Sequence, residues 1–212
     1  MIKKISKELV KDNIYHKIEE NFILTRRSKT KIPPLNEDIS YLLGVISGDG
    51  SVIKSKRKRG GNHYIVRIYS GEEKYLVYIT KIIKELFNIK GRITQDKRKN
   101  SAYCLILQNA PIFFYFVGLG AEIGKKKIGS ISHIIKSKKK NILNYIAGLV
   151  DTDGHVVGKR IQLKQKRYQL LKEIQELSER LDLNCSMPKV NYTNNIPFYY
   201  IRFDNKVPLR WK

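Results

Sequence analysis

The chain has 212 residues, of which 42 are Lys or Arg and 19 are Asp or Glu, so its formal net charge is +23. An excess of this size repels itself unless a polyanion is the usual neighbour, which makes nucleic acid the first candidate partner. The alternative that charge alone leaves open is a generally basic soluble protein. An anionic membrane surface is disfavoured, because the basic residues are not confined to one amphipathic helix.

The cysteines and the N-terminus argue against a disulfide-rich, zinc-binding, secreted or membrane protein. Cys104 and Cys185 are far apart and lack a CxxC partner, so neither a disulfide framework nor a zinc site is indicated. The N-terminus lacks the hydrophobic core of a signal peptide, and the most apolar run, Pro111 to Leu119, is too short to span a bilayer. We therefore expect an intracellular, cytoplasmic protein that does not enter a membrane.

The first 36 residues mix Lys, Arg and Ile and end in the breaker Pro33-Pro34. Their pattern does not recur later in the chain. We expect a basic N-terminal arm over residues 1–36, with a helix over Ile2 to Phe22 and basic side chains close to a phosphate backbone.

From Glu37 onward the pattern is regular and occurs twice. The elements predicted in the first copy are a helix at 37–49, strands at 51–58 and 62–70, a helix at 72–87, strands at 91–97 and 102–108, and a helix at 111–119. Those predicted in the second are a helix at 141–153, strands within 155–164, a helix at 167–181, and strands at 184–192 and 198–203. This order predicts an α+β fold with a first subdomain at 37–120, a basic linker at 121–140 and a second subdomain at 141–212.

Each copy begins with the same ten-residue element, Tyr41–Gly50 in the first and Tyr145–Gly154 in the second. Small residues recur four positions apart in both, Gly44 with Gly48 and Gly148 with Thr152. Residues four apart share one face of a helix, so each helix carries a stripe that is poor in side chains. Two such stripes allow two helix backbones to touch, and these four residues form the predicted helix interface.

An aspartate ends each of these helices. Asp49 and Asp153 precede glycines that suit a helix C-cap, so both carboxylates lie at the negative end of a helix dipole, which costs roughly 0.3–1 kcal/mol each. If the helices pack together, two carboxylates about 6 Å apart at an effective dielectric of about 20 repel by about 3 kcal/mol. Hard divalent cations would offset this cost, and we predict two or more Mg²⁺ ions shared by the pair. One such aspartate alone would be an ordinary helix end.

The two motifs resemble those of the LAGLIDADG homing endonucleases, in particular the single-chain, archaeal intron-encoded type with two motifs. The resemblance covers about Glu37 to Phe203. It implies two pseudo-symmetric αββαββα subdomains whose sheets form a saddle over the DNA major groove. It also implies a monomeric, Mg²⁺-dependent endonuclease that cuts both strands of a specific site by metal-assisted phosphodiester hydrolysis.

The resemblance assigns roles to individual residues. It implies metal binding at Asp49 and Asp153, with Gly48 and Thr152 beside them, water organisation by Gln165, and transition-state support by Lys126. Lys125 and Lys127 are equal alternatives to Lys126, and Lys206 and Lys212 are weak candidates in the second half. The sequence departs from the family at Ser47, where an acid is usual, and at Ser70 and Gly71, where the first half has no glutamine.

Alternation along the strands predicts which side chains face the DNA. In the strand at 62–70, for example, His63 and Arg67 lie opposite Val66 and Ile68. The runs 54–59 and 97–99 are loop-like and dense in charge, which suits phosphate contacts. The predicted DNA-binding residues are Lys54, Lys56, Arg57, His63, Arg67, Tyr69, Arg92, Thr94, Arg160, Gln162, Lys164 and Lys189.

Two other functions fit parts of this pattern. A non-cleaving RNA maturase or DNA-binding protein on the same fold would retain the aspartates as helix ends, and intron RNA would then be a partner. A basic ribosomal or structural RNA protein explains the charge but not the paired helices.

Because the two halves differ in sequence, the predicted target is a long, asymmetric stretch of double-stranded DNA.

Overall fold

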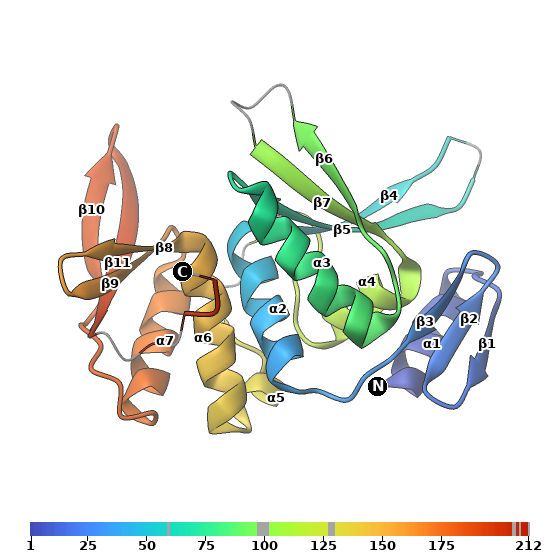
Figure 1. The fold of residues 1–212 in the computed structure, drawn as a ribbon, viewed down its shortest axis with the longest axis horizontal. Helices are drawn as coiled ribbons and strands as arrows, with labels where there is room; N and C mark the ends of the chain where they lie inside the picture. The colour runs from blue at the N-terminus through green and yellow to red at the C-terminus, as the bar shows by residue number, and fades with distance from the viewer. Residues whose placement is uncertain (59, 97–101, 127–129, 205–206, 208, 212) are drawn as a thin grey trace. The chain divides into compact units, whose positions relative to one another are not determined.

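The computed structural model of the protein describes residues 1–58, 60–96, 102–126, 130–204, 207 and 209–211 (Figure 1). Contacts divide the chain into two compact units. Met1–Leu35 and Asp49–Lys125 form the first unit, and Asn36–Gly48 and Lys126–Lys212 form the second. Within the described ranges, no helix is both long and apolar enough to cross a bilayer.

The first unit begins with an N-terminal module, residues 1–31, made of one helix and three short antiparallel strands. Its elements are α1 (Ile2–Lys11), β1 (His16–Glu19), β2 (Phe22–Thr25) and β3 (Ser28–Lys31), with the strands in the order β1-β2-β3. The expectation of a helix as far as Phe22 is therefore wrong. The helix stops at Lys11 because the chain turns at Asn13, which has a positive φ, and Glu20, also with a positive φ, lies in the turn between β1 and β2.

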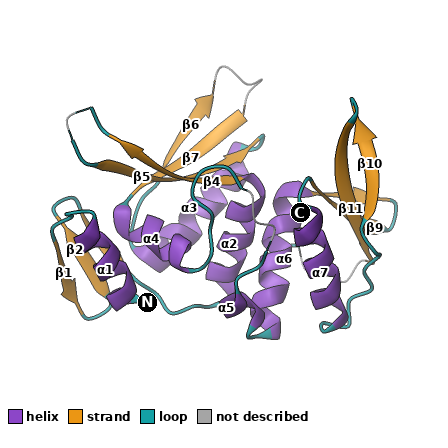
Figure 2. Ribbon diagram, turned by 180° about the vertical axis from the view of Figure 1, so that it is seen from behind, coloured by secondary structure: helices purple, strands orange, loops and turns teal. Residues whose placement is uncertain are grey.

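This N-terminal module packs on the rest of the first unit. Helix α1 buries Ile5 and Leu9, one helical turn apart, and contacts α4 (Ala110–Gly118) (Figure 2). The side-chain amide of Asn109 donates hydrogen bonds to the hydroxyls of Ser28 and Thr30, at 3.1 and 3.0 Å. The segment that resembled a loose arm is thus a packed part of the unit.

A second contact joins the N-terminal module to β4 (Gly50–Lys56) and β5 (Asn62–Ser70). Asp12 accepts a 2.7 Å hydrogen bond from the Tyr64 hydroxyl and lies 2.8 Å from the Lys54 ammonium nitrogen. Burial opposes ionisation of Asp12, but the hydrogen bonds from Lys54 and Tyr64 and the charge of Lys54 lower its pKa overall. Burial and the bond to Asp12 raise the pKa of Tyr64 to about 12, so the phenol stays a donor.

The Asp12 contact predicts a pH-dependent part of the stability. A carboxylate whose pKa is lower in the folded state stabilises the fold above its unfolded pKa, and that contribution is lost as the pH falls through the folded value. We expect Asp12→Asn to flatten the fall in melting temperature between about pH 5 and about pH 3. Thermal denaturation at several pH values measures this, with Glu176→Gln in α7 (Tyr168–Glu179) as the exposed control. An unchanged profile in Asp12→Asn would contradict the assignment.

The remainder of the first unit is a four-stranded antiparallel sheet with two helices on one face (Figure 1). Its further elements are α3 (Glu73–Phe87), β6 (Arg92–Asp96) and β7 (Ala102–Gln108), and the strand order is β4-β5-β7-β6. Alternation in β5 agrees with prediction, since Tyr64, Val66 and Ile68 are buried and Arg67 is only half-buried. Phe87, Tyr115 and Phe116 fill the core between the helices.

The second unit combines the helix of the first motif with the second repeat. Its elements are α2 (Glu37–Asp49, of which residues up to Gly48 belong here), α5 (His133–Lys136), α6 (Lys139–Asp153), β8 (Gly154–Val157), β9 (Arg160–Gln165), α7, β10 (Lys189–Thr193) and β11 (Ile196–Asp204). The strands run in the order β10-β11-β9-β8, and α6 and α7 pack on one face of this sheet. The compact units therefore differ from the predicted repeat boundaries, because α2 packs so closely on α6.

The segment expected to be a linker has packed contacts in each unit. In the first unit, the backbone NH of Gly124 donates a 2.8 Å hydrogen bond to the carbonyl of Val52. In the second, Glu173 of α7 accepts from the backbone NH of Ile131 and from the Lys136 ammonium group, both at 2.5 Å. Helix α6 begins at Lys139, inside the expected linker. These contacts, and the burial of Ile131, tie the connection to both units.

Candidate active site and nucleic-acid surface

The site is built on the contact between α2 and α6, two helices of the second unit that lie side by side (Figure 1). A Cβ atom at Gly44 would lie well under 3.0 Å from the carbonyl oxygen of Tyr145. One at Gly148 would lie equally close to the carbonyl oxygen of Tyr41. Only hydrogen atoms fit at these two positions, so the backbones touch along the small-residue stripes.

In each helix, a tyrosine hydroxyl donates a hydrogen bond to a side chain of the other helix. The hydroxyl of Tyr41 donates to Asp151 at 2.8 Å, and that of Tyr145 donates to the Ser47 hydroxyl at 2.9 Å. Both tyrosines are the first residue of their motif, and both acceptors are the seventh. The matched tyrosines of the repeat are the sequence signal of this exchange, which the helix spacing alone does not predict.

Arg210, near the C-terminus, contacts both α2 and α6. The backbone NH of Arg210 donates to Asp151 at 3.3 Å, and its guanidinium carbon lies 4.8 Å from the centre of the Tyr41 ring. The Arg210 guanidinium also forms an ion pair with Asp38 at 2.5 Å. Arg210 therefore stacks on the tyrosine that Asp151 binds, which supports the orientation of that ring.

Asp153 ends α6 and is held from the sheet. The side-chain amide of Gln165, the last residue of β9, donates a hydrogen bond to Oδ2 of Asp153. The carbonyl of Gln165 in turn accepts from the guanidinium of Arg167, at 3.2 and 3.3 Å. This chain of contacts fixes the amide of Gln165 with its NH₂ group toward the carboxylate, and so orients Asp153.

The end of α2 carries two cationic contacts. Nζ of Lys126 donates to the carbonyls of Ser47, at 2.8 Å, and of Gly48. Nη2 of Arg167 donates to the same Ser47 carbonyl at 2.7 Å. The last carbonyls of a helix lack partners within the helix, which explains why cations bind there. Of the alternatives to Lys126, Lys125 is exposed, and Lys127 lies outside the described residues, as do Lys206 and Lys212.

The side chains around Gly48 bring oxygen atoms together. A Cβ atom at Gly48 would clash with the Thr152 hydroxyl and lie 2.8 Å from Oδ2 of Asp153. The Thr152 hydroxyl donates to the carbonyls of Gly148 and Leu149, at 3.1 and 2.9 Å. The absence of a side chain at Gly48 thus makes room for the carboxylate of Asp153.

The donor types at the helix ends fit a hard divalent cation. The described residues contain no group of three or more His, Cys, Asp or Glu that could hold a metal by themselves. Mg²⁺ does not need such a group, because it is commonly bound by one or two carboxylates together with water and substrate phosphates. Asp153, the last residue of α6 in the second unit, is a carboxylate of this kind, and Asp49, the last residue of α2, belongs to the first unit.

The first half lacks the glutamine that holds Asp153 in the second. Its corresponding position is Ser70, the last residue of β5, and the Ser70 hydroxyl accepts a 3.0 Å hydrogen bond from the backbone NH of Glu72. The hydroxyl of Ser70 therefore caps the turn into α3. Ser70 and Gln165 therefore have different contacts: Ser70 binds a backbone NH group, and Gln165 binds the carboxylate of Asp153.

In the first unit, the strand register gathers the predicted base-contacting residues on one face of the sheet. Arg67 pairs with Ile106 of β7, and Ile106 pairs with Arg92 of β6, so the two arginines flank one apolar side chain. Nε of Arg67 and Oγ of Ser51, which face each other across β4 and β5, have no hydrogen-bond partner in the described structure. His63, Tyr69 and Thr94 lie on the same face.

The second sheet carries a comparable face, on which Arg202 and Tyr200 of β11 join the predicted residues. Gln162 is buried, and its carbonyl accepts a 2.9 Å hydrogen bond from Nε of Arg202, the opposite residue on β11. The Arg202 guanidinium lies 5.3 Å from the ring centre of Tyr200. Residue Lys164 is paired with Tyr200, as is Lys189, and both lysines are exposed. Arg160, also exposed, lies 3.7 Å from Asp204.

The basic run at 54–59 differs from expectation. Residues up to Lys56 are part of strand β4 and not of a loop, because their register with β5 continues to Asn62. Lys54 pairs with Tyr64 on the helix-covered side of the sheet, opposite Arg67, and Lys56 follows it on that side. Lys54 forms the ion pair with Asp12 described above. Arg59 and the run at 97–99 lie outside the described residues.

Comparison with known proteins places this architecture in a family. The profile of the LAGLIDADG-like domain matches residues 36–113 and 140–203, which include both motif helices. An uncharacterized protein of Methanocaldococcus jannaschii is 22% identical over 143 residues, which are 66% of this chain and 49% of that protein. The chain thus spans about half the length of this curated relative.

Solved structures with a similar fold include that of I-DmoI in complex with DNA and Ca, with a TM-score of 0.61 and 22% identity over 80% of this chain and 84% of that chain. The N-terminal LAGLIDADG domain of DUF199/WhiA aligns with a TM-score of 0.51 and 14% identity, over 78% of this chain and 74% of that one. Since the family profile covers well over half of the chain and both motifs, the protein belongs to the LAGLIDADG-like domain family, and its fold is similar to that of the homing endonuclease I-DmoI.

Proposed function

We propose that this protein is a monomeric, site-specific DNA endonuclease that cuts both strands of a long asymmetric site by metal-assisted phosphodiester hydrolysis. The observation that carries the proposal is the orientation of Asp153 at the end of a motif helix by Gln165 and Arg167. A helix end that served only to turn the chain would not need this support. The fold shared with I-DmoI, whose structures contain DNA with Ca, Mn or Mg, supports it further.

The two motif aspartates are the proposed metal ligands, with the oxygens near Gly48 and Thr152 beside them. When bound, Mg²⁺ or a similar cation would lower the pKa of an attacking water and stabilise the leaving oxygen. Gln165 holds the Asp153 carboxylate in one orientation, which preserves the geometry that Mg²⁺ requires. The charge of Lys126, held at the Ser47 and Gly48 carbonyls, is suited to stabilise charge that develops on the phosphate.

DNA recognition is assigned to the exposed faces of the two sheets. Arg67 and Arg92 each present a guanidinium group that matches the paired acceptors of guanine in the major groove. The unpartnered Nε of Arg67 is consistent with a hydrogen bond that forms only in the complex. In the second half, Arg202 joins Lys164 and Lys189 on the predicted surface. The net charge of +23 supplies the long-range attraction to the phosphate backbone.

The test separates binding from cleavage. Duplexes that bind the full chain are first selected from a randomised DNA library in EDTA, and the selected duplexes are then incubated with the protein and Mg²⁺. We expect linear products with one defined pair of ends, and no products in EDTA. A matched reaction contains the double variant Asp49→Asn, Asp153→Asn.

Each outcome of that experiment decides between functions. Cleavage by the parent and not by the double variant supports the endonuclease. Selective binding without cleavage in Mg²⁺ or Mn²⁺ would overturn the proposal in favour of a non-cleaving binding protein. Failure to select any duplex, with binding of structured RNA instead, would favour a maturase-like role with intron RNA as partner.

A further inference from the structure

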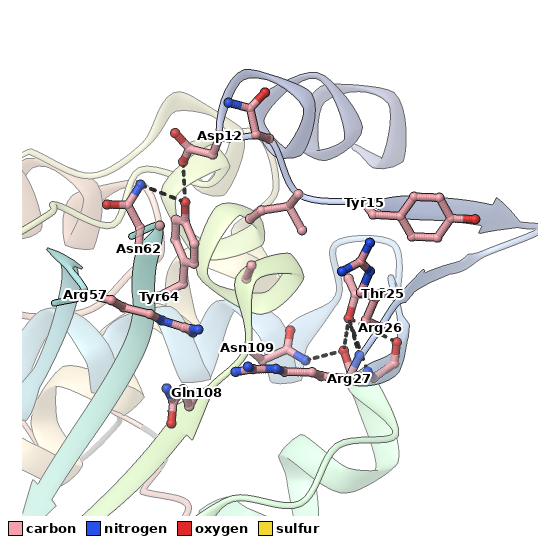
Figure 3. A pocket seen from close by; sticks show the side chains of 15 residues that line it. Asp12, Tyr15, Thr25, Arg26, Arg27, Arg57, Asn62, Tyr64, Gln108 and Asn109 are labelled. Carbon is pink, nitrogen blue, oxygen red and sulfur yellow. Dashed lines mark hydrogen bonds between the residues drawn. The ribbon is translucent and has the colours of Figure 1, made fainter. Parts of the chain in front are cut away.

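A cavity of about 490 Å³ lies in the first unit between the N-terminal module and the end of the first sheet (Figure 3). It is bounded by the loop after α1, the turn between β2 and β3, the end of the β4–β5 hairpin and the start of α4. The labelled side chains include Tyr15, Arg26, Arg27, Arg57 and Asn109 (Figure 3). None of these elements belongs to the motif helices.

The cavity is electropositive. The described residues that line it include three arginines, Arg26, Arg27 and Arg57, and one acid, Asp12. The carboxylate of Asp12 is already bound by Lys54 and Tyr64. Across the described part of the chain, no ion pair joins the three guanidinium groups to a carboxylate. Three such groups around one open space repel each other and favour an anionic ligand.

One of the arginines has an unsatisfied donor inside the structure. Nε of Arg57 is buried and has no hydrogen-bond partner among the described atoms. A buried NH group without an acceptor is costly, and a guanidinium group is well suited to phosphate oxygens. Nearby amide side chains, those of Asn62 and Gln108, add polar groups to the same wall. These features distinguish the cavity from a gap between packed elements.

The cavity is continuous with the face assigned to DNA recognition. Gln108, which lines the cavity, lies 2.9 Å from Nδ1 of His63 through its side-chain nitrogen. His63 lies on the same face of the sheet as Arg67, four residues earlier in β5. At the outer rim, Tyr15 is 67% exposed, and the guanidinium carbon of Arg26 lies 5.9 Å from the centre of its ring. A DNA strand that follows the face of the first sheet past His63 would therefore reach the arginines of the cavity next.

We propose that this cavity binds phosphates of the nucleic-acid backbone beyond the stretch read by the first sheet, with Arg27 and Arg57 as the main contacts and Tyr15 against a sugar or base. An exposed aromatic ring beside basic groups is a common platform for nucleotides. The N-terminal module thereby lengthens the nucleic-acid footprint. The inference rests on the proposed DNA-binding function and assigns it a second, separate site.

The test uses the salt dependence of binding by the full chain. The affinity for a long labelled duplex, and for the matching single strand, is measured at several salt concentrations for the parent and for Arg27→Ala, Arg57→Ala and their double variant. Log affinity falls as log salt rises, and each lost phosphate contact reduces the magnitude of this negative slope by about 1. We therefore expect a loss of about 2 in the double variant on the nucleic acid that enters the cavity. Arg180→Ala, an exposed arginine outside the cavity, is the matched control.

The outcomes separate this inference from the proposed function. If the parent binds and Arg67→Ala lowers its affinity, but the double variant keeps the slope of the parent, the cavity assignment is wrong and DNA binding stands. If Arg180→Ala lowers the slope equally, the effect is general charge, which also overturns the assignment. If the parent binds no nucleic acid, the proposed function fails first.

Inorganic phosphate provides a separate arm, because a free anion and a backbone phosphate share the same chemistry. Its binding is followed by NMR shifts of the arginine side chains in the parent and in Arg57→Ala. Loss of phosphate binding in the variant, together with the lost slope, supports the proposal. Loss of phosphate binding with an unchanged slope would make the cavity a site for small anions and would overturn it.

Discussion

Asp49→Asn and Asp153→Asn are each expected to lower the rate of DNA cleavage by about 10³-fold, the upper end of what the loss of one transition-state contact costs. The substitution keeps the shape of the side chain and removes its charge, so the proposed metal loses a ligand while the helix end stays intact. DNA affinity should be unchanged or higher, because a negative charge near the phosphates is removed. Single-turnover cleavage of a selected duplex and binding in EDTA measure the two effects separately.

The control for the aspartate variants is Asp182→Asn, which makes the same change of charge at an exposed position. Asp182 has a φ of 56°, a conformation that asparagine adopts readily, so its fold should be unaffected. Cleavage by Asp182→Asn should match the parent. Equal rates in all three variants would remove the motif aspartates from the mechanism.

Gln165→Ala provides a graded comparison within the same assay. Gln165 touches Asp153 and not the proposed reacting atoms, so it is a positioning residue. Loss of such support typically costs 10- to 100-fold in metal affinity or activity, and we expect the Mg²⁺ concentration for half-maximal cleavage to rise by about that factor. A change in maximal rate at saturating Mg²⁺, with no shift along the metal axis, would assign Gln165 a different role.

Gly44→Ala and Gly148→Ala are expected to lower the free energy of unfolding of the second unit by about 2 kcal/mol each. Overpacking costs about 1–3 kcal/mol, here at its upper end because the added Cβ meets backbone atoms that cannot rotate away. The better helix propensity of alanine returns up to about 1 kcal/mol. Denaturant unfolding followed by circular dichroism measures the loss.

Gly71→Ala is the matched control for the helix glycines, because a Cβ atom there meets nothing within 4 Å. Its stability should remain within about 0.5 kcal/mol of the parent. If Gly44→Ala and Gly148→Ala were equally neutral, the backbones of α2 and α6 would have to lie further apart than described. Reduced cleavage without reduced stability would instead point to a shift of the motif ends.

Much of the secondary structure in the two repeats follows from local patterns. Alternation and turn residues predict β5 and β7 at both ends, and the helix predicted at 37–49 matches α2. The N-terminal module was not predictable in the same way. Its three strands have four residues each, too short for alternation to stand out, and the turns at Asn13 and Glu20 use positive φ values that no glycine signals.

The candidate site was predictable where its residues belong to the repeated motif. Gly44, Gly148 and Asp153 occupy positions whose helical spacing places them together on paired helices. Arg167 was missed because it lies 120 residues from the Ser47 carbonyl that it binds. Likewise, Lys54 has the composition of a phosphate ligand, but its register on β4 directs it to Asp12.

The sequence by itself determined the net charge, the duplication, and the placement of small residues and carboxylates along two helices, because each of these depends on composition or on spacing within one element. Only the tertiary structure decided that Gln165 and Arg167 hold Asp153, that Lys126 caps α2, and that three arginines surround one cavity. Those contacts depend on how elements far apart in the chain pack against each other. Helical or strand periodicity describes one element at a time and carries no information about this packing.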